Sequence, residues 1–356
     1  MLENSPLKSK NIRVYSQLIA SIIKSSAFGL IVYFCTILFA KRSTLRVNNV
    51  LLGVVIVGLV MVYGFPLIVE NSLSGISYTR TLLLWSLPII YYAIGVNDLN
   101  NKTYERLLLI MMIYSVCEFL MINFTGVSLF ESDRMRSARN FGFIRSEGVA
   151  HNSSISSALI ISIFLKIYLE KGLSIKTFVI ALTSILFLGS GAGMLLFIFA
   201  IVFFIINRII LIVLSILSLI LLGIFFTQLP AMEILGNIHP KISYEYISFI
   251  WNFKLEQLAF MLDTDYRDIL LGFSLRDNAV VTSGDFGYGT MLLGVGLGPA
   301  LFLMFGISVM FIRASRIGNF APFFILMIET FHYPAFVDPI SAYLMAQYAI
   351  AQRSEE

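Results

Sequence analysis

Long, continuous apolar segments dominate the chain. Most of them approach the roughly 20 residues that a helix needs to cross a bilayer. Their apolar residues follow one another without the period-two alternation of an outer-membrane barrel. The pattern therefore predicts an all-α integral membrane protein. The segments fall at about 26–40, 50–69, 80–96, 105–124, 153–169, 175–206, 208–227, 288–312, 319–336 and 339–351.

Segment 175–206 is too long for a single span. It is interrupted by Gly189-Ser190-Gly191-Ala192-Gly193, and glycine both weakens a helix and permits a tight turn. We interpret the segment as two spans that meet at this turn. The alternative is one helix with a face of small residues packed closely against a neighbour.

The positions of Lys and Arg give the predicted orientation, because short loops rich in these residues stay on the cytoplasmic side. This rule places segments 70–79, 125–150, 189–193 and 228–287 outside. The N-terminal cations obey it if 12–40 forms a helical hairpin that turns near Lys24. The prediction is a single polytopic domain, residues 1–356, with about 11–12 transmembrane helices and both ends in the cytoplasm. The cations assigned to the inside are Lys8, Lys10, Arg13, Lys41, Arg42, Arg46, Lys102, Arg106, Lys166, Lys171, Lys176, Arg208, Arg313, Arg316 and Arg353.

Composition supports this class. The chain has 356 residues, of which 58% are hydrophobic and 13% charged, and a mean hydropathy of +0.86. An ordinary globular domain carries about 25% charged residues, so a secreted domain and a cytosolic enzyme are excluded. A net charge of +4 is small for this length and argues against nucleic acid as a partner. Cys35 and Cys117 lie in apolar runs, and we interpret them as buried small hydrophobic residues.

Two outer loops stand apart, 125–150 and 228–287. The first contains four arginines and no lysine, namely Arg134, Arg136, Arg139 and Arg145. Guanidinium binds phosphate through two parallel hydrogen bonds and stays charged. We therefore predict that this loop is a site for an anionic, lipid-linked ligand. The alternative is a loop that attracts lipid headgroups, which lysine would do equally well.

Polar residues also gather where the outer loops enter spans. Arg145-Ser146-Glu147-Gly148 precedes His151-Asn152, and Glu147 is a candidate general base or ligand of a sugar hydroxyl. The alternative is that Asn152 or Ser153 caps the helix.

The second outer loop ends in two glycine-containing motifs, 272–278 and 283–289. Their glycines permit the close approach of a ligand. Asp277 and Asp285 are candidate acid/base or hydroxyl-binding groups, Arg276 is a candidate second phosphate clamp, and Arg267 is a further candidate ligand of substrate. The alternative is a glycine-rich loop in which Asp285 caps a helix.

A last motif, Glu329-Thr330-Phe331-His332-Tyr333-Pro334, lies within an apolar run and precedes Asp338-Pro339. Glu329 and His332 are expected one turn apart on the same helix face. Ionisable residues at membrane depth are costly and indicate function, whereas the alternative is an interhelical hydrogen bond. No spacing typical of a metal site or of a Walker loop occurs, so no metal and no cofactor are expected.

The order of these features resembles the bacterial polysaccharide polymerases of the O-antigen and capsule pathways (Wzy type), which are related to the O-antigen ligases. Segment 140–148, Asn-Phe-Gly-Phe-Ile-Arg-Ser-Glu-Gly, resembles the Arg-x-x-Gly stretch that precedes a span in that family. Asp285-Phe286-Gly287-Tyr288 with the glycines of 292–298 resembles its aspartate and glycine-rich span, and His332-Tyr333-Pro334 its late histidine span. One departure is Gly189-Ser190-Gly191, where relatives often have Ser-Arg.

The resemblance implies the architecture of the GT-C-type lipid-sugar glycosyltransferases and a metal-independent reaction. A glycan would pass from undecaprenyl pyrophosphate to the non-reducing end of a second lipid-linked repeat unit, on the outer side of the bacterial inner membrane. Expected partners are undecaprenyl-pyrophosphate-linked oligosaccharides, membrane lipids, a chain-length regulator and a flippase. An O-antigen ligase and a lipid-linked oligosaccharide flippase are the alternatives.

The resemblance also suggests roles for the candidate residues. Arg145 and Arg276 would hold pyrophosphates, with Arg134, Arg136 and Arg139 as lesser partners. Glu147, Asp285 or His332 would take the proton of the acceptor hydroxyl. The remaining candidates for substrate binding are His151, Arg267 and Asp277.

Overall fold

The computed structural model describes residues 6–38, 72–94, 99–127, 139–140, 143–205, 265–272 and 287–350, with isolated residues between 217 and 263. Contacts divide the chain into two compact units, residues 1–197 with 267–356, and residues 198–266. The described part is helical, apart from a two-residue antiparallel pair, β1 (Arg139–Asn140) and β2 (Phe143–Ile144). All contacts described below lie within the first unit.

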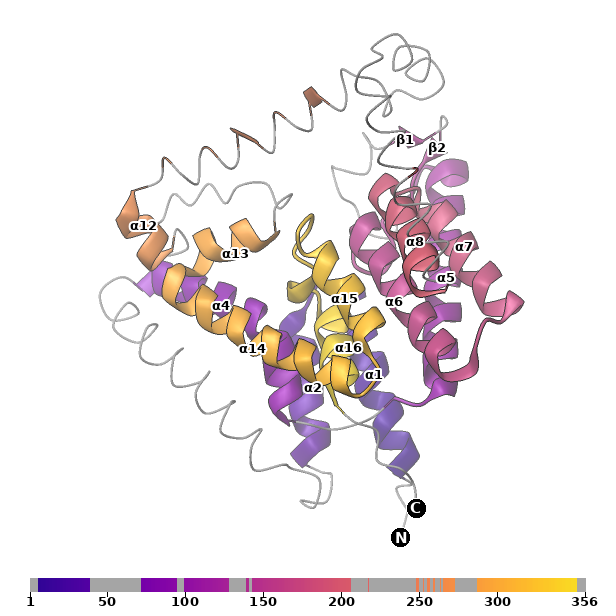
Figure 1. Ribbon diagram of the computed structural model, residues 1–356, viewed down its shortest axis with the longest axis horizontal. Coiled ribbons are helices and arrows are strands. Elements are labelled where there is room, and N and C mark those ends of the chain that lie inside the picture. The colour runs from indigo at the N-terminus through magenta and orange to yellow at the C-terminus, as the bar shows by residue number, and fades with distance from the viewer. Residues whose placement is uncertain are drawn as a thin grey trace. The chain divides into compact units, whose positions relative to one another are not determined.

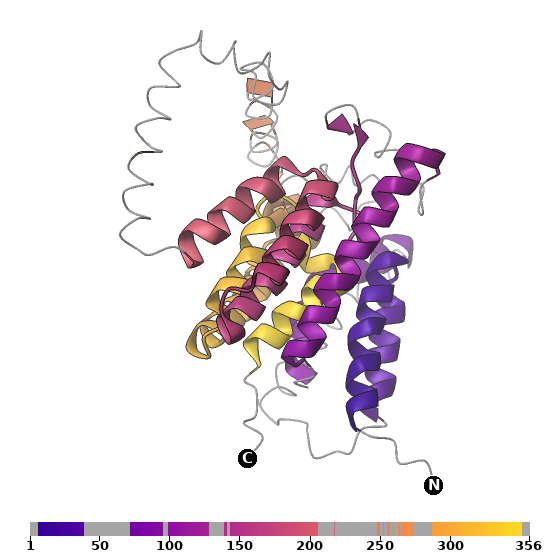
Figure 2. The ribbon, with the colours of Figure 1, turned by 90° about the vertical axis from the view of Figure 1, so that its right-hand side faces the viewer.

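The N-terminal segment forms a helical hairpin of α1 (Pro6–Ile22) and α2 (Ser26–Leu38). The two helices run side by side (Figure 2). The chain turns at Lys24, whose φ is 52°. Gln17 crosses between the helices and donates from Nε2 to the carbonyl oxygen of Gly29 at 2.9 Å. The predicted hairpin and its turn near Lys24 are confirmed.

Three helices, α5 (Asn101–Thr125), α6 (Ser153–Lys171) and α7 (Ile175–Leu188), pack against one another (Figure 1). Helix α6 is buried along almost its whole length. Helix α7 ends at Gly189, which has the left-handed φ of 57°, and α8 (Gly191–Phe204) begins two residues later. The turn predicted within 175–206 is therefore present.

Helix α4 (Ser72–Ile94) packs against four C-terminal elements, α13, α14, η5 and α16. Helix α16 contacts α1, α4 and α14, whereas α15 lies against α6 and joins the two groups of helices. The C-terminal elements are α12 (Tyr266–Leu271), α13 (Gly287–Val295), α14 (Leu297–Arg316), α15 (Phe320–Glu329), the 3-10 helix η5 (Ala335–Val337) and α16 (Pro339–Ala349).

The apolar segment 288–312, expected to be one span, is broken between α13 and α14. Gly296 has a φ of 83° at the break. The hydroxyl of Tyr78 donates to the carbonyl oxygen of Val295 at 3.0 Å, so the interrupted backbone gains a partner. A Cβ on Gly272 would lie 2.6 Å from the backbone nitrogen of Gly296. The backbone of the chain itself, and not a ligand, therefore makes the close approach at Gly272.

Three described helices, α5, α6 and α14, are long and apolar enough to cross a membrane, and α7, α8 and α15 are shorter apolar helices. This supports a multi-pass membrane protein. The predicted span at 50–69 and most of 208–287 lie outside the described residues. The interpretation of Cys35 and Cys117 as buried is wrong, because both are exposed. They occupy outward faces of α2 and α5, where an apolar residue suits a lipid environment.

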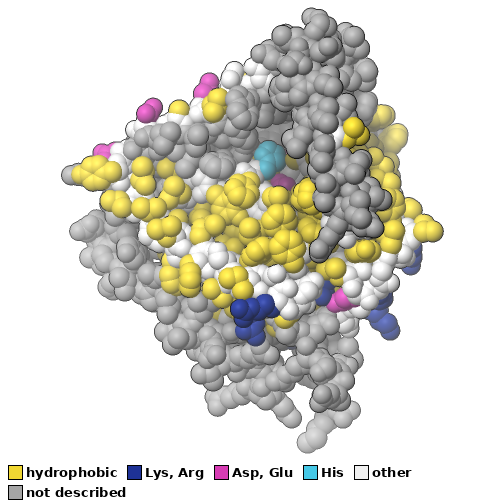
Figure 3. All heavy atoms as spheres, viewed as in Figure 1, with side chains coloured by type: hydrophobic (Ala, Val, Ile, Leu, Met, Phe, Trp, Pro, Cys, Tyr) yellow, Lys and Arg dark blue, Asp and Glu magenta, His cyan; other side chains and the backbone are white. Residues whose placement is uncertain are grey.

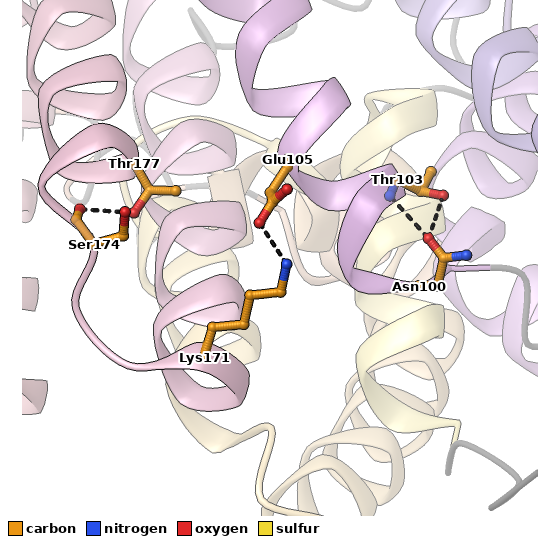
Figure 4. Close-up of polar contacts among 6 residues, drawn as sticks. All are labelled: Asn100, Thr103, Glu105, Lys171, Ser174 and Thr177. Carbon is orange, nitrogen blue, oxygen red and sulfur yellow. Dashed lines mark hydrogen bonds and ion pairs between the residues drawn. The ribbon is translucent and has the colours of Figure 1, made fainter.

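The described Lys and Arg side chains of α5, α6 and α7 meet at one end of these helices, which we call the cationic end. Lys171 at the end of α6 forms an ion pair of 2.6 Å with Glu105 in the first turns of α5 (Figure 4). Asn100 caps α5 there, with Oδ1 accepting from the backbone nitrogen of Thr103 at 2.9 Å. The opposite end, where α1, α5, α7 and α15 finish and α6 and α16 begin, is called the distal end.

Helices α6 and α15 are antiparallel. Lys166, near the end of α6, donates from Nζ to Oδ1 of Asn319 at 2.7 Å, and Asn319 directly precedes α15. The start of α6 and the end of α15 therefore both lie at the distal end. The positive-inside rule predicts that this end faces outside.

Candidate functional site

The candidate site is built on segment 145–152, which joins β2 to the start of α6 at the distal end. Asn123 of α5 holds the last residue of β2 with two hydrogen bonds of 2.8 Å, one to the nitrogen and one to the oxygen of Ile144. The Arg-Ser-Glu-Gly motif therefore leaves β2 beside the end of α5.

Glu118 of α5 is the buried centre of this region. The side chain is 0% exposed. Its Oε2 accepts hydrogen bonds from the hydroxyl of Ser146 and, at 2.8 Å, from the backbone nitrogen of Gly148. Glu118 is not among the candidates predicted from the sequence, although an acidic residue inside the apolar segment 105–124 gives the same signal as Glu329.

The turn at Gly148 is fixed from three sides. Its φ is 70°, and a Cβ there would lie 2.6 Å from Oγ of Ser156 and 2.7 Å from Cδ2 of Leu188. Ser156 of α6 donates to the carbonyl oxygen of Glu147 at 2.9 Å and accepts from the nitrogen of Ala150 at 3.2 Å. Helices α5, α6 and α7 thus hold the backbone beside Glu147 in one conformation.

The mid-chain glycine turn lies against the same end of α6. The hydroxyls of Ser154 and Ser190 are 2.8 Å apart. Ser190 also accepts from the nitrogen of Gly193 at 3.1 Å, at the start of α8. Its hydroxyl therefore serves local structure.

His151 ties this segment to α1. Its ring Nε2 lies 2.6 Å from the carbonyl oxygen of Ile22. Burial lowers the pKa of His151, and nearby Lys24 acts in the same direction. The neighbouring Asn152 caps α6, accepting from the backbone nitrogens of Ser154 and Ile155 at 2.9 and 3.2 Å. The capping alternative is therefore right for Asn152.

A second cluster follows α15. Glu329 is 3% exposed, and its Oε1 has no hydrogen-bond partner within the described residues. The expectation that Glu329 and His332 share a helix face is wrong, because α15 ends at Glu329 and His332 lies in a turn. Pro334 explains the end of the helix: it lacks the N–H that would bond to the carbonyl of Thr330, and its ring clashes with that carbonyl in a helix.

Gly287 packs directly against this turn. A Cβ on Gly287 would overlap the carbonyl oxygen of Thr330 and lie 3.1 Å from the nitrogen of Pro334. The aspartate-and-glycine motif and the late histidine motif are therefore adjacent. The aromatic rings of Tyr288 and Phe331 cover the junction at 4.6 Å between centroids. The space at Gly287 is again filled by backbone rather than by a ligand.

Both clusters lie at the distal end and are linked through the last turn of α1. Ile22 contacts His151, as described, while Oγ of Ser21 accepts from the nitrogen of Ile340 at 3.1 Å. Asp338, which caps α16 with a bond of 2.9 Å to the nitrogen of Ser341, has its pKa raised to about 6 by burial. In the space-filling view, a histidine and an acidic side chain lie close together among hydrophobic side chains, away from the Lys and Arg side chains (Figure 3).

The structure describes only part of the predicted set. The side chains of Arg145, Glu147, His151 and His332 are described: Glu147 is buried and the other three are half-buried. Only the backbone of Arg139 and Arg267 is described. Arg134, Arg136, Arg276, Asp277 and Asp285 lie outside the described residues. That Arg145 and Arg276 hold pyrophosphates therefore stays a prediction.

Within the described ranges, no group of three or more His, Cys, Asp and Glu side chains could hold a metal ion. The fold and the site together define a helical, multi-pass membrane protein with buried carboxylates at one end of its bundle. Comparisons with models of protein families, with curated proteins and with solved structures gave no match to this chain.

Proposed function

We propose that this chain is a metal-independent glycosyltransferase of the inner membrane, a polysaccharide polymerase of the Wzy type with a GT-C-type architecture. It transfers a glycan from undecaprenyl pyrophosphate to the non-reducing end of another lipid-linked repeat unit. The active face is extracytoplasmic.

One observation carries the proposal: the 145–151 segment and the turn after α15 share the distal end of the bundle, although about 180 residues separate them. Lys166 with Asn319 fixes the antiparallel pairing of α6 and α15, and Ile22 with His151 joins α1 to the same end. Gly287 and Tyr288 of the third motif pack against the turn after α15, so described residues of all three motifs behind the resemblance lie at one end of the bundle.

The chemistry that this arrangement supports is displacement at an anomeric carbon. The acceptor hydroxyl oxygen forms the new glycosidic bond as the bond between the anomeric carbon and the pyrophosphate oxygen breaks. The leaving pyrophosphate gains negative charge, and a preorganised guanidinium such as that of Arg145 stabilises it best where water is scarce. The proton of the acceptor passes to Glu147, Asp285 or His332.

The test is the glycan ladder of a strain that lacks this chain and is complemented with variants. Arg145→Ala, Arg276→Ala and His332→Ala are expected to insert into the membrane normally and to give single-repeat glycans only. Arg106→Ala is the matched control, because Arg106 is an exposed arginine at the cationic end, and it should give a full ladder.

Each other outcome has a defined meaning. A normal ladder with Arg145→Ala would remove Arg145 from the site. Free polymer retained on the lipid carrier in the deletion strain would indicate the ligase instead. Repeat units trapped on the cytoplasmic leaflet would indicate the flippase.

A further inference from the structure

Three buried polar atoms around the 145–148 segment have no hydrogen-bond partner within the described residues. They are Oη of Tyr114, Oε1 of Glu118 and Nε of Arg145. Tyr114 and Glu118 are four residues apart on α5 and so lie on the same helix face. The hydroxyl of Tyr114 interacts electrostatically with the carboxylates of both Glu118 and Glu147, and these two carboxylates interact with each other. Tyr114 and Glu118 therefore lie together with Glu147, and Arg145 directly precedes Ser146, whose hydroxyl donates to Glu118.

Such unpaired atoms are unusual in a folded protein. Buried polar atoms nearly always have a partner, and each exception requires an explanation. Leaving them unpaired costs free energy. Two such atoms on one face of α5, and a third on Arg145 in the adjoining segment, indicate that a group from outside the chain completes the hydrogen bonds.

The hydrogen-bonding pattern defines that group. The hydroxyl of Tyr114 and the Nε–H of Arg145 are donors, whereas Oε1 of Glu118 is an acceptor. A phosphate only accepts and would be repelled by Glu118 and Glu147, and a cation would leave the arginine N–H unpaired. A pair of hydroxyl groups both donates and accepts, as on the ring of a sugar.

Glu118 is already oriented for this role. Its Oε2 is held by the hydroxyl of Ser146 and the nitrogen of Gly148, so Oε1 has a fixed direction without any ligand. A fixed side chain loses little conformational entropy on binding, which favours affinity.

We propose that Tyr114, Glu118 and Nε of Arg145 form a subsite for sugar hydroxyls that recognises the glycan of the lipid-linked substrate. The inference rests on the proposed function and deepens it. Arg145 contacts the glycan through Nε, and its terminal nitrogens remain for the pyrophosphate. Tyr114 and Glu118 thereby join the substrate-binding residues.

The test compares two probes for binding to the purified full-length protein in detergent. One is the single-repeat lipid-linked glycan extracted from a strain that lacks this chain. The other is undecaprenyl pyrophosphate without a glycan. The wild-type protein should bind the glycan probe more tightly than the bare carrier.

Two substitutions should remove that preference. Glu118→Gln keeps an oxygen for Ser146 and Gly148 but presents an amide donor in place of the acceptor Oε1, and Tyr114→Phe removes only the hydroxyl. Glu118→Gln should weaken binding of the glycan probe about tenfold or more, as expected for a hydrogen bond to a charged group, and Tyr114→Phe about two- to tenfold, as expected for one between neutral groups. Both should leave binding of the bare carrier unchanged. Glu105→Gln and Tyr168→Phe, the same changes toward the cationic end of α5 and α6, should leave both affinities unchanged.

The outcomes separate the two hypotheses. If the wild-type protein binds neither probe, the proposed function fails. If it prefers the glycan probe and Tyr114→Phe and Glu118→Gln keep that preference, the subsite is overturned while the proposed function stands. Should Glu118→Gln fail to fold, as judged by its unfolding temperature, Tyr114→Phe carries the test alone.

Discussion

At the scale of single residues, Gly148 is a position in the site where any side chain would be destabilising. Alanine there would adopt a φ of 70° and overlap Ser156 and Leu188. Left-handed backbone costs a non-glycine residue about 1–2 kcal/mol, and overpacking adds about 1–3 kcal/mol. Gly148→Ala should therefore lower the free energy of unfolding in detergent by the sum of both effects.

Gly172→Ala is the matched control for this prediction. Gly172 has a φ of 76°, but a Cβ at this position would meet no atom within 4 Å, so only the backbone cost of about 1–2 kcal/mol applies. Equal losses for the two variants would show that the segment beside Gly148 rearranges freely.

Because of His151, we expect the folded protein to lose stability in acid. Since burial lowers the pKa of His151 from the ordinary value of 6.5, the unfolded chain binds the proton more readily than the folded chain does. Its contribution is complete above that ordinary pKa and is lost as the pH falls through the lower folded pKa. The unfolding temperature should therefore fall more steeply below about pH 6.5 for the wild-type protein than for His151→Gln.

The comparison with His151→Gln separates the contribution of His151 to the pH dependence of stability from the contributions of other groups. Asp338 acts in the opposite direction, because its raised pKa of about 6 gives stability that is lost as the pH rises. Parallel pH profiles for the wild-type protein and the variant would contradict the role of His151.

Some individual residues of the candidate site could be predicted from the sequence. Arg145, Glu147 and His151 form a dense polar group before an apolar run, and the structure places all three in the segment that joins β2 to α6. Glu118 has a signal in the sequence, an acidic residue in an apolar segment, but its partners Ser146 and Gly148 could not be predicted because they lie 28 and 30 residues away. The expected pairing of Glu329 with His332 fails because periodicity alone does not show where Pro334 ends the helix.

Between elements, the packed interface of α6 and α15 contains a buried polar contact at one end. Lys166 is 5% exposed and bonds to Asn319 and Glu170, while Asn319 donates to the carbonyl oxygen of Tyr348 at 2.9 Å. Asn319→Ala would leave the buried lysine with fewer partners. It should lower the free energy of unfolding by about 2–3 kcal/mol, as for a hydrogen bond to a buried charge.

The exposed ion pair at the same end serves as the control. Lys171 and Glu105 are both about 40% exposed, and such pairs contribute about 0–1 kcal/mol. A loss from Lys171→Ala as large as that from Asn319→Ala would contradict the importance of the buried contact.

Helix boundaries marked by turn-forming residues such as glycine could be predicted from the sequence. The turn at 189–193 has its glycines as such a signal, whereas the hairpin that turns at Lys24 is predicted from the positions of the N-terminal cations. The break between α13 and α14 could not be predicted, because Gly296 resembles a small residue of a packed helix. Its stabilising partner, Tyr78, lies 217 residues away in the chain, and pairing over that distance leaves no pattern in the sequence.

For the whole molecule, the orientation in the membrane is the next prediction. With Cys35 and Cys117 replaced by Ser, Val127→Cys at the distal end should react with a membrane-impermeant maleimide in intact spheroplasts. Leu173→Cys at the cationic end should react only after permeabilisation, because both positions are exposed but lie on opposite sides. The reverse labelling would place the site on the cytoplasmic face and exclude a polymerase.

The most direct measurement uses the purified protein in detergent, where no leaflet has to be crossed. Supplied with single-repeat lipid-linked glycan, a chelator and no nucleotide sugar, the wild-type protein and Arg106→Ala should produce lengthened lipid-linked glycans and release undecaprenyl pyrophosphate. Arg145→Ala should produce none. Folded wild-type protein that lengthens no glycan, or does so only with a nucleotide sugar or a metal ion, would contradict the assignment.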